Sequence, residues 1–129
     1  YSTFLCSQKV LPYMKKKRWG RIINFGCAAA DAITIRKNTT PYYIAKTAVI
    51  MLTKVLAYEY AKYGITINSI SPGIMPTSVT KPKSQFAQST QLVQFSDITH
   101  AINLLLKEDS SAINGANIEI SGGWRPGYI

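Results

Sequence analysis

The sequence predicts an α/β fold built on a parallel sheet. Three short apolar runs rich in β-branched residues alternate with three longer segments whose apolar residues recur at helical spacing. Their order is helix, strand, helix, strand, helix, strand, and the connections suit a parallel sheet. Three strands and three helices cannot cover both faces and both edges of such a sheet. We therefore interpret the 129 residues as a single partial domain, to which another half would add parallel strands.

The first predicted helix covers residues 3–17, with a mostly apolar first half and a basic end. Cations at a helix end complement the helix dipole, so we interpret the run 15–18 as a solvated helix end rather than a phosphate-binding patch. Gly20 then interrupts the pattern. Residues 21–25 form a short β-branched run that is typical of a strand buried on both faces.

The second helix is expected to begin at Thr40 and Pro41, after a loop over residues 26–40. Thr40 would be the N-cap, and Pro41 would take the first helical position, where its missing N–H is harmless. Gly64 would end the helix. Between them, one face carries an apolar stripe of Ala45, Ala48, Val49, Leu52, Val55 and Leu56. The stripe fits burial on the sheet and burial against another subunit equally well.

A second buried strand is predicted over residues 65–70, ending in a tight turn at residues 71–73. Residues 77–95 are polar and rich in Thr, Ser and Gln, which is typical of a mobile loop that covers a site.

The third helix would be capped by Ser96 or Asp97. Its buried side would hold Ile98, Ala101, Ile102 and Leu105. The pair Asn114-Gly115 then turns the chain into a last strand over residues 116–121.

Composition narrows the classes of partner. The net charge of +9 invites a nucleic-acid function, but the basic residues are spread thinly, so no nucleic-acid partner is expected. No apolar run approaches the roughly 18 residues of a membrane span, so no membrane partner is expected. The spacing of Cys6 and Cys27 is not that of a metal site or of a redox cysteine pair. His100 has no potential ligands near it at the spacing of a metal site. We expect no metal, and two free thiols in a reducing cytosol.

Four sequence blocks resemble one known family. They are residues 20–26 (GRIINFG), 42–46 (YYIAK, the spacing Tyr-x-x-x-Lys), 65–77 with its Pro-Gly turn, and 113–124 with its Gly-Gly end. In this order and at this spacing they resemble the short-chain dehydrogenase/reductase family, most closely its 3-oxoacyl-acyl-carrier-protein reductase type. The resemblance implies the C-terminal half of a Rossmann-like, doubly wound parallel sheet.

The resemblance also implies a function. Members interconvert a ketone and a secondary alcohol by hydride transfer with NADP or NAD, so a small carbonyl or alcohol substrate is implied. The full protein would be a homodimer or homotetramer. The family's nucleotide-binding elements would lie upstream of Tyr1, and this chain contains no GxGxxG element, so alone it should not hold a dinucleotide.

Tyr42 and Lys46 are the implied catalytic residues. A free tyrosine has a pKa of about 10 and is almost fully protonated at neutral pH. Lys46 follows one helical turn later on the same face, so we expect its ammonium to lower the pKa of Tyr42 by about 2. By resemblance, both residues would also contact the cofactor. Without the family blocks, an ordinary aromatic and a surface lysine would be the simpler interpretation.

Cys27 stands where the family usually has a catalytic serine. A thiol is a weak hydrogen-bond donor, whereas the serine hydroxyl orients and polarises the substrate carbonyl. The loop before Tyr42 is slightly longer than usual, so Thr34, Thr39 or Thr40 could supply a substitute hydroxyl. A small buried cysteine with no catalytic part is the open alternative.

Four further residues would line the nicotinamide by resemblance: Pro72, Gly73, Ile74 and Thr77. Gly73 would let the backbone approach a ligand closely. Taken alone, these residues form only a turn at the end of a strand. An alternative function also stays open, that of a catalytically weak or silent member which acts as a cofactor-binding or interaction scaffold.

Overall fold

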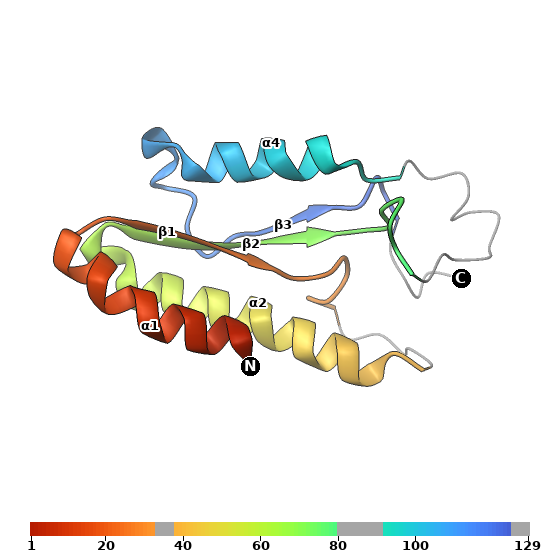
Figure 1. Cartoon of the computed structure of the whole chain (residues 1–129), viewed down its shortest axis with the longest axis horizontal. Coiled ribbons are helices and arrows are strands. Elements are labelled where there is room, and N and C mark those ends of the chain that lie inside the picture. Colours follow the sequence, from red (N-terminus) through yellow and green to blue (C-terminus); the bar gives the residue numbers. More distant parts are fainter. Residues whose placement is uncertain (33–37, 80–91, 125–129) are drawn as a thin grey trace.

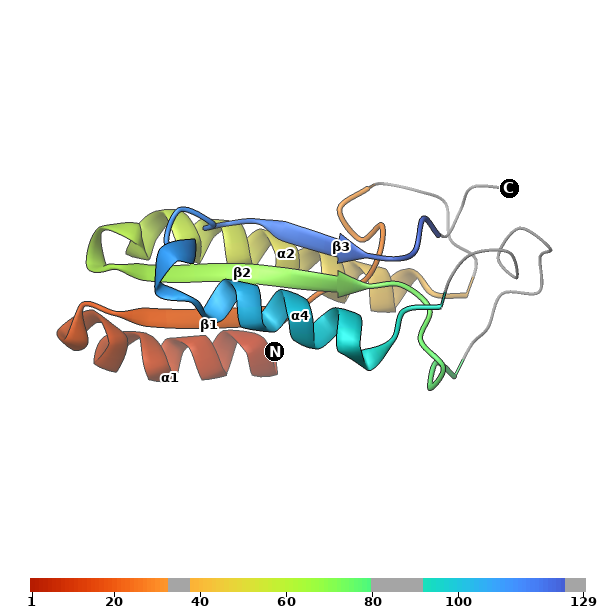
Figure 2. The same ribbon diagram turned by 90° about the horizontal axis from the view of Figure 1, so that it is seen from above.

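The computed structural model describes residues 1–32, 38–79 and 92–124. Within these ranges the helices are α1 (Ser2–Lys17), α2 (Thr40–Tyr60) and α4 (Phe95–Leu106), and the strands are β1 (Gly20–Phe25), β2 (Ile65–Pro72) and β3 (Asn117–Ile120). Two short 3₁₀ helices, η1 (Ala61–Tyr63) and η2 (Glu108–Ser110), follow α2 and α4. Helices α1 and α2 lie on one face of the sheet and α4 on the other (Figures 1 and 2). The predicted α/β class is confirmed.

The sheet has the order β1-β2-β3, and both pairs are parallel, as predicted. Gly20 pairs with Ile65 at one end of β1, and Ser69 pairs with Asn117 where β3 begins. The central strand β2 is buried from Ile65 to Ser71. All three strands end at the same side of the molecule, on the right in Figure 1. In a parallel sheet this carboxyl end is where ligands bind.

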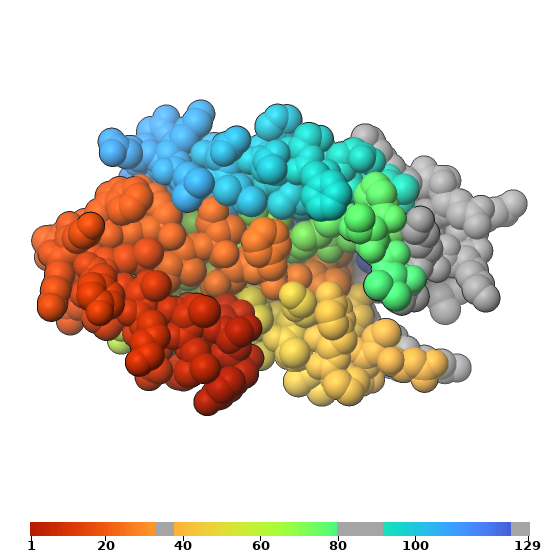
Figure 3. Space-filling view, in the orientation of Figure 1, coloured from red at the N-terminus to blue at the C-terminus, as the bar shows by residue number. Residues whose placement is uncertain are grey.

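Strand β1 departs from the prediction of burial on both faces. Phe25 at its carboxyl end is 46% exposed, and Ile22 and Ile23 are only partly buried. The reason is that β1 is the outer strand of the described sheet and pairs with β2 alone. The space-filling view shows β1, in orange, exposed between α4 and the two helices of the opposite face (Figure 3).

Two apolar cores hold the layers together. On the α1 and α2 side, Ile65 and Ile67 of β2 contact Leu11 and Ala57. On the α4 side, the core consists of Ile70, Val93, Ile98 and Leu105, with Ala101 and Ile102 packed against it. The predicted buried side of this helix is therefore confirmed. Each fully buried isoleucine or leucine contributes about 1.5–3 kcal/mol of transfer free energy.

Helix α2 turns only part of the predicted apolar stripe toward the sheet, one of the two placements that the sequence left open. Its buried residues are Ile50, Thr53 and Ala57, whereas Ala45, Ala48 and Val55 of the predicted stripe are exposed. The helix is apolar around most of its circumference, so periodicity alone does not select a face. The face is fixed instead by a polar contact, because Asn24 Nδ2 donates to Thr53 Oγ1 at 2.9 Å in the buried layer between β1 and α2.

The ends of the elements correct several predictions. The N-cap of α2 is Thr39, one residue before the expected Thr40, so Pro41 takes the second helical position rather than the predicted first. The N-cap of α4 is Gln94 rather than Ser96 or Asp97. Asp97 instead occupies the third helical position and accepts the Gln94 N–H at 2.8 Å, which closes a capping box.

Other boundaries agree more closely. Gly64 ends the α2–η1 segment at φ 71°, as expected. Lysines 15–17 occupy the exposed last turn of α1. Strand β2 runs through Pro72, beyond the predicted residue 70, because Gly73 N–H still bonds to Ile120 O at 2.8 Å.

Some predictions fall on residues that the structure leaves undescribed. Most of the predicted covering loop, residues 80–91, lies outside the described residues, and so does Thr34. Both cysteines are free thiols. Among the described helices, none combines the length and the apolar character that a membrane span requires.

Candidate active site

The candidate site lies at the carboxyl end of the sheet. Cys27 lies two residues after the end of β1, Tyr42 and Lys46 lie in the first two turns of α2, and Pro72 ends β2. These segments come from distant parts of the sequence and meet at one end of the molecule (Figure 1). The fold therefore gathers residues that the sequence separates, because parallel strands place their carboxyl ends on one side.

The side chains of Tyr42 and Cys27 interact. Burial and the neighbouring Cys27 thiol, through its charge and a hydrogen bond, raise the pKa of Tyr42 to about 12. Tyr42 as a whole is still 51% exposed. Tyr43 packs edge-on against it, with ring centroids 5.4 Å apart.

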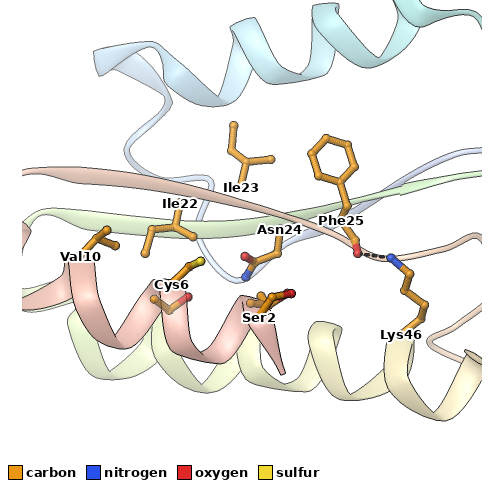
Figure 4. Close-up of a pocket in the computed structure, with 10 residues that line it drawn as sticks. Ser2, Cys6, Val10, Ile22, Ile23, Asn24, Phe25 and Lys46 are labelled. Atoms are coloured by element: carbon orange, nitrogen blue, oxygen red, sulfur yellow. Dashed lines mark hydrogen bonds between the residues drawn. The ribbon is translucent and has the colours of Figure 1, made fainter.

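Lys46 lies on the same helix face as Tyr42, as predicted, but it does not lower the tyrosine pKa. Its Nζ donates to Phe25 O at 2.9 Å (Figure 4). The same Nζ lies 5.8 Å from the centroid of the Tyr42 ring. The ammonium thus sits over the ring and is held by the last carbonyl of β1. The expected fall in the Tyr42 pKa is therefore wrong for this arrangement, in which burial and Cys27 dominate.

The loop that carries Cys27 is fixed by hydrogen bonds from three elements. Ala28 N–H donates to Pro72 O of β2 at 3.0 Å. Ala29 N–H donates to Glu119 Oε2 of β3 at 2.9 Å. Thr47 of α2 donates its hydroxyl to Ala30 O at 2.6 Å. The three alanines are buried, at 0%, 2% and 1% exposure, so the loop is part of the packed interior.

Gly26 lets this loop leave β1 close to β2. A side chain at this position would meet Ser71 Oγ and the Ile50 side chain. Gly26 N–H extends the sheet pairing by one residue, since it donates to Ile70 O at 2.8 Å. The loop therefore begins at a position where only glycine fits.

The residues predicted to line the nicotinamide lie at the same end of the sheet. Ile74 is buried at 6% exposure, and its carbonyl accepts Val93 N–H at 2.9 Å. Thr77 is exposed. A side chain on Gly73 would lie 2.8 Å from Ser121 Cα. The close approach of Ser121, just after β3, thus favours glycine at this position, and the predicted approach of a ligand to Gly73 stays a prediction.

Two residues of the site were missed by the sequence interpretation, Thr47 and Glu119. Thr47 directly follows Lys46 and shares its helix. Glu119 stands between Ile118 and Ile120 in the short strand β3. A carboxylate inside an otherwise apolar strand is the signal that could have drawn attention to it, because a partly buried charge needs hydrogen-bond donors.

The arrangement fits part of the implied cofactor. The Lys46 ammonium and the Tyr42 hydroxyl are donors at the carboxyl end of the sheet, and they suit the ribose and the nicotinamide half of NAD or NADP. No glycine-rich phosphate-binding turn occurs in the sequence. In the part of the chain that the structure describes, no group of three His, Cys, Asp or Glu residues could hold a metal ion.

Comparison with known proteins places these observations in context. The family described as Enoyl-(Acyl carrier protein) reductase matches residues 1–125. The 3-oxoacyl-acyl-carrier-protein reductase of Haemophilus influenzae is 32% identical over 130 residues, which cover 95% of this chain and 53% of the relative. The D-beta-hydroxybutyrate dehydrogenase of Rhizobium meliloti is 29% identical over 143 residues, covering 95% of this chain and 55% of the relative.

A solved structure agrees in fold. The gluconate 5-dehydrogenase of Burkholderia cenocepacia, in complex with NADP and tartrate, superposes with a TM-score of 0.82 at 27% identity. The match covers 94% of this chain and 51% of that one. The chain thus spans about half the length of the curated relatives it matches. The relatives are named reductases and dehydrogenases, and their names give no support to the scaffold alternative.

Proposed function

Because the chain belongs to the short-chain dehydrogenase/reductase family, we propose that it forms the catalytic half of an NAD(P)-dependent oxidoreductase acting on a ketone and its secondary alcohol. The observation that carries this proposal is the grouping of Tyr42, Cys27 and Lys46 at the carboxyl end of the sheet. The residues are those that carbonyl reduction needs, namely a proton donor, a neighbouring polar group and a cation.

Tyr42 is proposed as the acid. With a pKa of about 12, its hydroxyl is protonated at neutral pH and can donate its proton to a substrate oxygen. NADPH or NADH, when bound, supplies the hydride. The protonated form of Tyr42 is the one that ketone reduction requires, so we propose reduction of the ketone as the favoured direction.

Lys46 and Cys27 are proposed to act beside Tyr42. By resemblance, the Lys46 ammonium is proposed to contact the cofactor ribose; it is held by Phe25 O at 2.9 Å and lies 5.8 Å from the centroid of the Tyr42 ring. Cys27 occupies the position of the carbonyl polariser, although its thiol is a weak donor and already interacts with Tyr42. By resemblance, Pro72, Gly73, Ile74 and Thr77 are proposed to contact the nicotinamide.

The rest of the domain is proposed to bind along the open side of β1. Figure 4 shows a groove there between α1 and β1, with a volume of about 390 Å³. Cys6, Val10 and Ile22 are among its lining residues, and Phe25 and Lys46 lie together at one end of it (Figure 4). An outer strand of a parallel sheet has unpaired backbone groups, so a further parallel strand fits this edge. It would bring the nucleotide-binding half beside Lys46.

A 3-oxoacyl substrate and a homo-oligomer are the finer parts of the proposal. The H. influenzae relative is named for 3-oxoacyl reduction, and the B. cenocepacia structure contains NADP, which favours NADP over NAD. The exposed face of α2 supports subunit contact, since Ile44, Met51 and Val55 are 65%, 64% and 56% exposed. A cytoplasmic location is proposed from the two free thiols.

A chimera tests this function. The segment of the H. influenzae reductase that precedes its matched region is joined to this chain, and NADPH fluorescence is followed with a 3-oxoacyl thioester and with a diketone. We expect NADPH to bind and its fluorescence to fall with turnover of at least one substrate. A folded chimera that binds NADPH and turns over neither substrate would overturn the proposal.

A further inference from the structure

We propose that Glu119 is a positioning residue, which holds the loop of Cys27 against Tyr42 through the backbone N–H of Ala29. This inference rests on the proposed function, because it assigns a support to the proposed site. It concerns a residue of the last strand, far from the site in sequence, since Ala29 and Glu119 are 90 positions apart.

The carboxylate of Glu119 uses both oxygens. Oε2 accepts Ala29 N–H at 2.9 Å, and Oε1 accepts the Ser121 hydroxyl at 3.1 Å. Glu119 itself is fixed in the sheet, where it is paired in register with Ser71 of β2. A charged acceptor makes a stronger hydrogen bond than a neutral one. Strand β3 therefore presents a rigid, charged acceptor to the loop that follows β1.

Ala29 needs such an acceptor for two reasons. Its φ of 57° lies in the left-handed region, which disfavours residues with a Cβ, so the loop needs outside contacts to keep this conformation. The residue is also only 2% exposed, so its N–H would be buried without water if the carboxylate were removed. The contact with Glu119 answers both needs.

The position of Ala29 sets the position of Cys27. A turn joins them, because Ala30 N–H donates to Cys27 O at 3.0 Å. On either side, Ala28 is bound to Pro72 and Ala30 to Thr47. Thr47 follows Lys46 on α2, so the same set of bonds joins the loop to the helix of Tyr42. Removing the middle bond loosens the turn that carries Cys27, whose thiol donates to Ala28 O at 3.6 Å.

The reactivity of the Cys27 thiol gives a direct test in the full chain. A Cys6→Ser background leaves Cys27 as the single thiol. We expect E119A to raise the rate of alkylation by iodoacetamide about tenfold, because the loop opens and exposes the thiol. E119Q keeps a carbonyl oxygen for Ala29 and should stay within about twofold of the parent. Glu59→Ala, an exposed glutamate on α2, is the matched control and should change nothing.

A second set of measurements separates positioning from general destabilisation. In the chimera, E119A should lower kcat about tenfold and leave the KM for NADPH within about twofold, with E119Q restoring most of kcat. If E119A does not fold, E119D serves as the second variant. Its shorter side chain keeps the charge but moves the carboxylate oxygen away from Ala29 N–H, so the alkylation rate of Cys27 should rise about threefold.

The outcomes are distinguishable. Parental alkylation rates in E119A and E119D would overturn the inference, whatever the chimera does. Raised alkylation in a chimera that turns over no substrate would leave Glu119 in place as the support of the loop and remove the proposed reaction. Unchanged alkylation in an active chimera would remove the role of Glu119 alone.

Discussion

The Lys46 ammonium binds the carbonyl of Phe25, at 2.9 Å, while its charge lies over the ring of Tyr42 rather than at the hydroxyl. This bond joins the second turn of α2 to the last residue of β1, the strand whose outer side is open. It also leaves the Tyr42 pKa under the control of burial and of Cys27. The protonation state of Tyr42 therefore depends on the relative placement of α2, β1 and the loop that carries Cys27.

Lys46→Gln is predicted to lower kcat/KM of the chimera about a hundredfold, since it removes the ammonium that is proposed to hydrogen-bond the cofactor ribose. The fold should persist, because the amide can still donate to Phe25 O. Lys54→Gln, on the exposed side of the same helix, is the control and should keep parental kinetics. Equal kinetics in both variants would contradict a role for Lys46.

The pH dependence of the two directions should differ. Below its pKa of about 12 Tyr42 holds its proton, so ketone reduction should vary little with pH across the neutral range. Alcohol oxidation needs the deprotonated phenol, so its rate should rise about tenfold for each pH unit. It should show no plateau below about pH 11. Initial rates in both directions, measured in the chimera over a range of buffers, check this. A plateau of oxidation near neutral pH would contradict the raised pKa.

Cys27→Ser is predicted to raise kcat about tenfold or more, because a hydroxyl polarises a carbonyl better than a thiol does.

Cys27→Ala removes the thiol contact and should lower the pKa of Tyr42 from about 12 while burial still keeps it above 10. Absorbance titration of the tyrosinate, with Tyr42→Phe subtracted, reports that pKa. A Cys27→Ala variant with the parental pKa would show that the thiol has no effect on Tyr42.

The buried pair Asn24 and Thr53 should matter for stability. Thr53→Val keeps the shape of the side chain and leaves the Asn24 amide without its acceptor at 2.9 Å, so the free energy of unfolding should fall by about 1–3 kcal/mol. Urea denaturation followed by circular dichroism measures this. An exposed control, Lys54→Ala, should stay within about 0.5 kcal/mol of the parent. If Thr53→Val lowers the free energy of unfolding no more than this control does, the Asn24–Thr53 pair does not hold α2 on β1.

The parts of the fold that the sequence predicts are those governed by local pattern. The buried face of α4 was correct because apolar residues such as Ile98 and Leu105 occupy a single side of that helix. The sequence left the placement of the α2 stripe open because that helix is apolar nearly all round, and Thr53 with its partner Asn24 selects the face. Such a choice depends on a contact between strand and helix that no local window contains.

The site shows the same division. The shared face of Tyr42 and Lys46 follows from helical spacing and is confirmed. The raised pKa of Tyr42 depends on where Cys27 and the Phe25 carbonyl lie in space, so the sequence predicted its direction wrongly. Glu119 was missed because its contact with Ala29 exists only once β3 has joined the sheet.

Single-turnover reduction by Tyr42→Phe, compared with Tyr43→Phe as the neighbouring control, tests the central claim most directly. Both variants lose one phenol oxygen, and the two rings are in edge contact, so their effects on packing are comparable. With the chimera and NADPH both in excess over the ketone, we predict that Tyr42→Phe lowers the rate of hydride transfer about a thousandfold. Tyr43→Phe should stay within about threefold of the parent. Equal rates in the two variants would contradict Tyr42 as the proton donor.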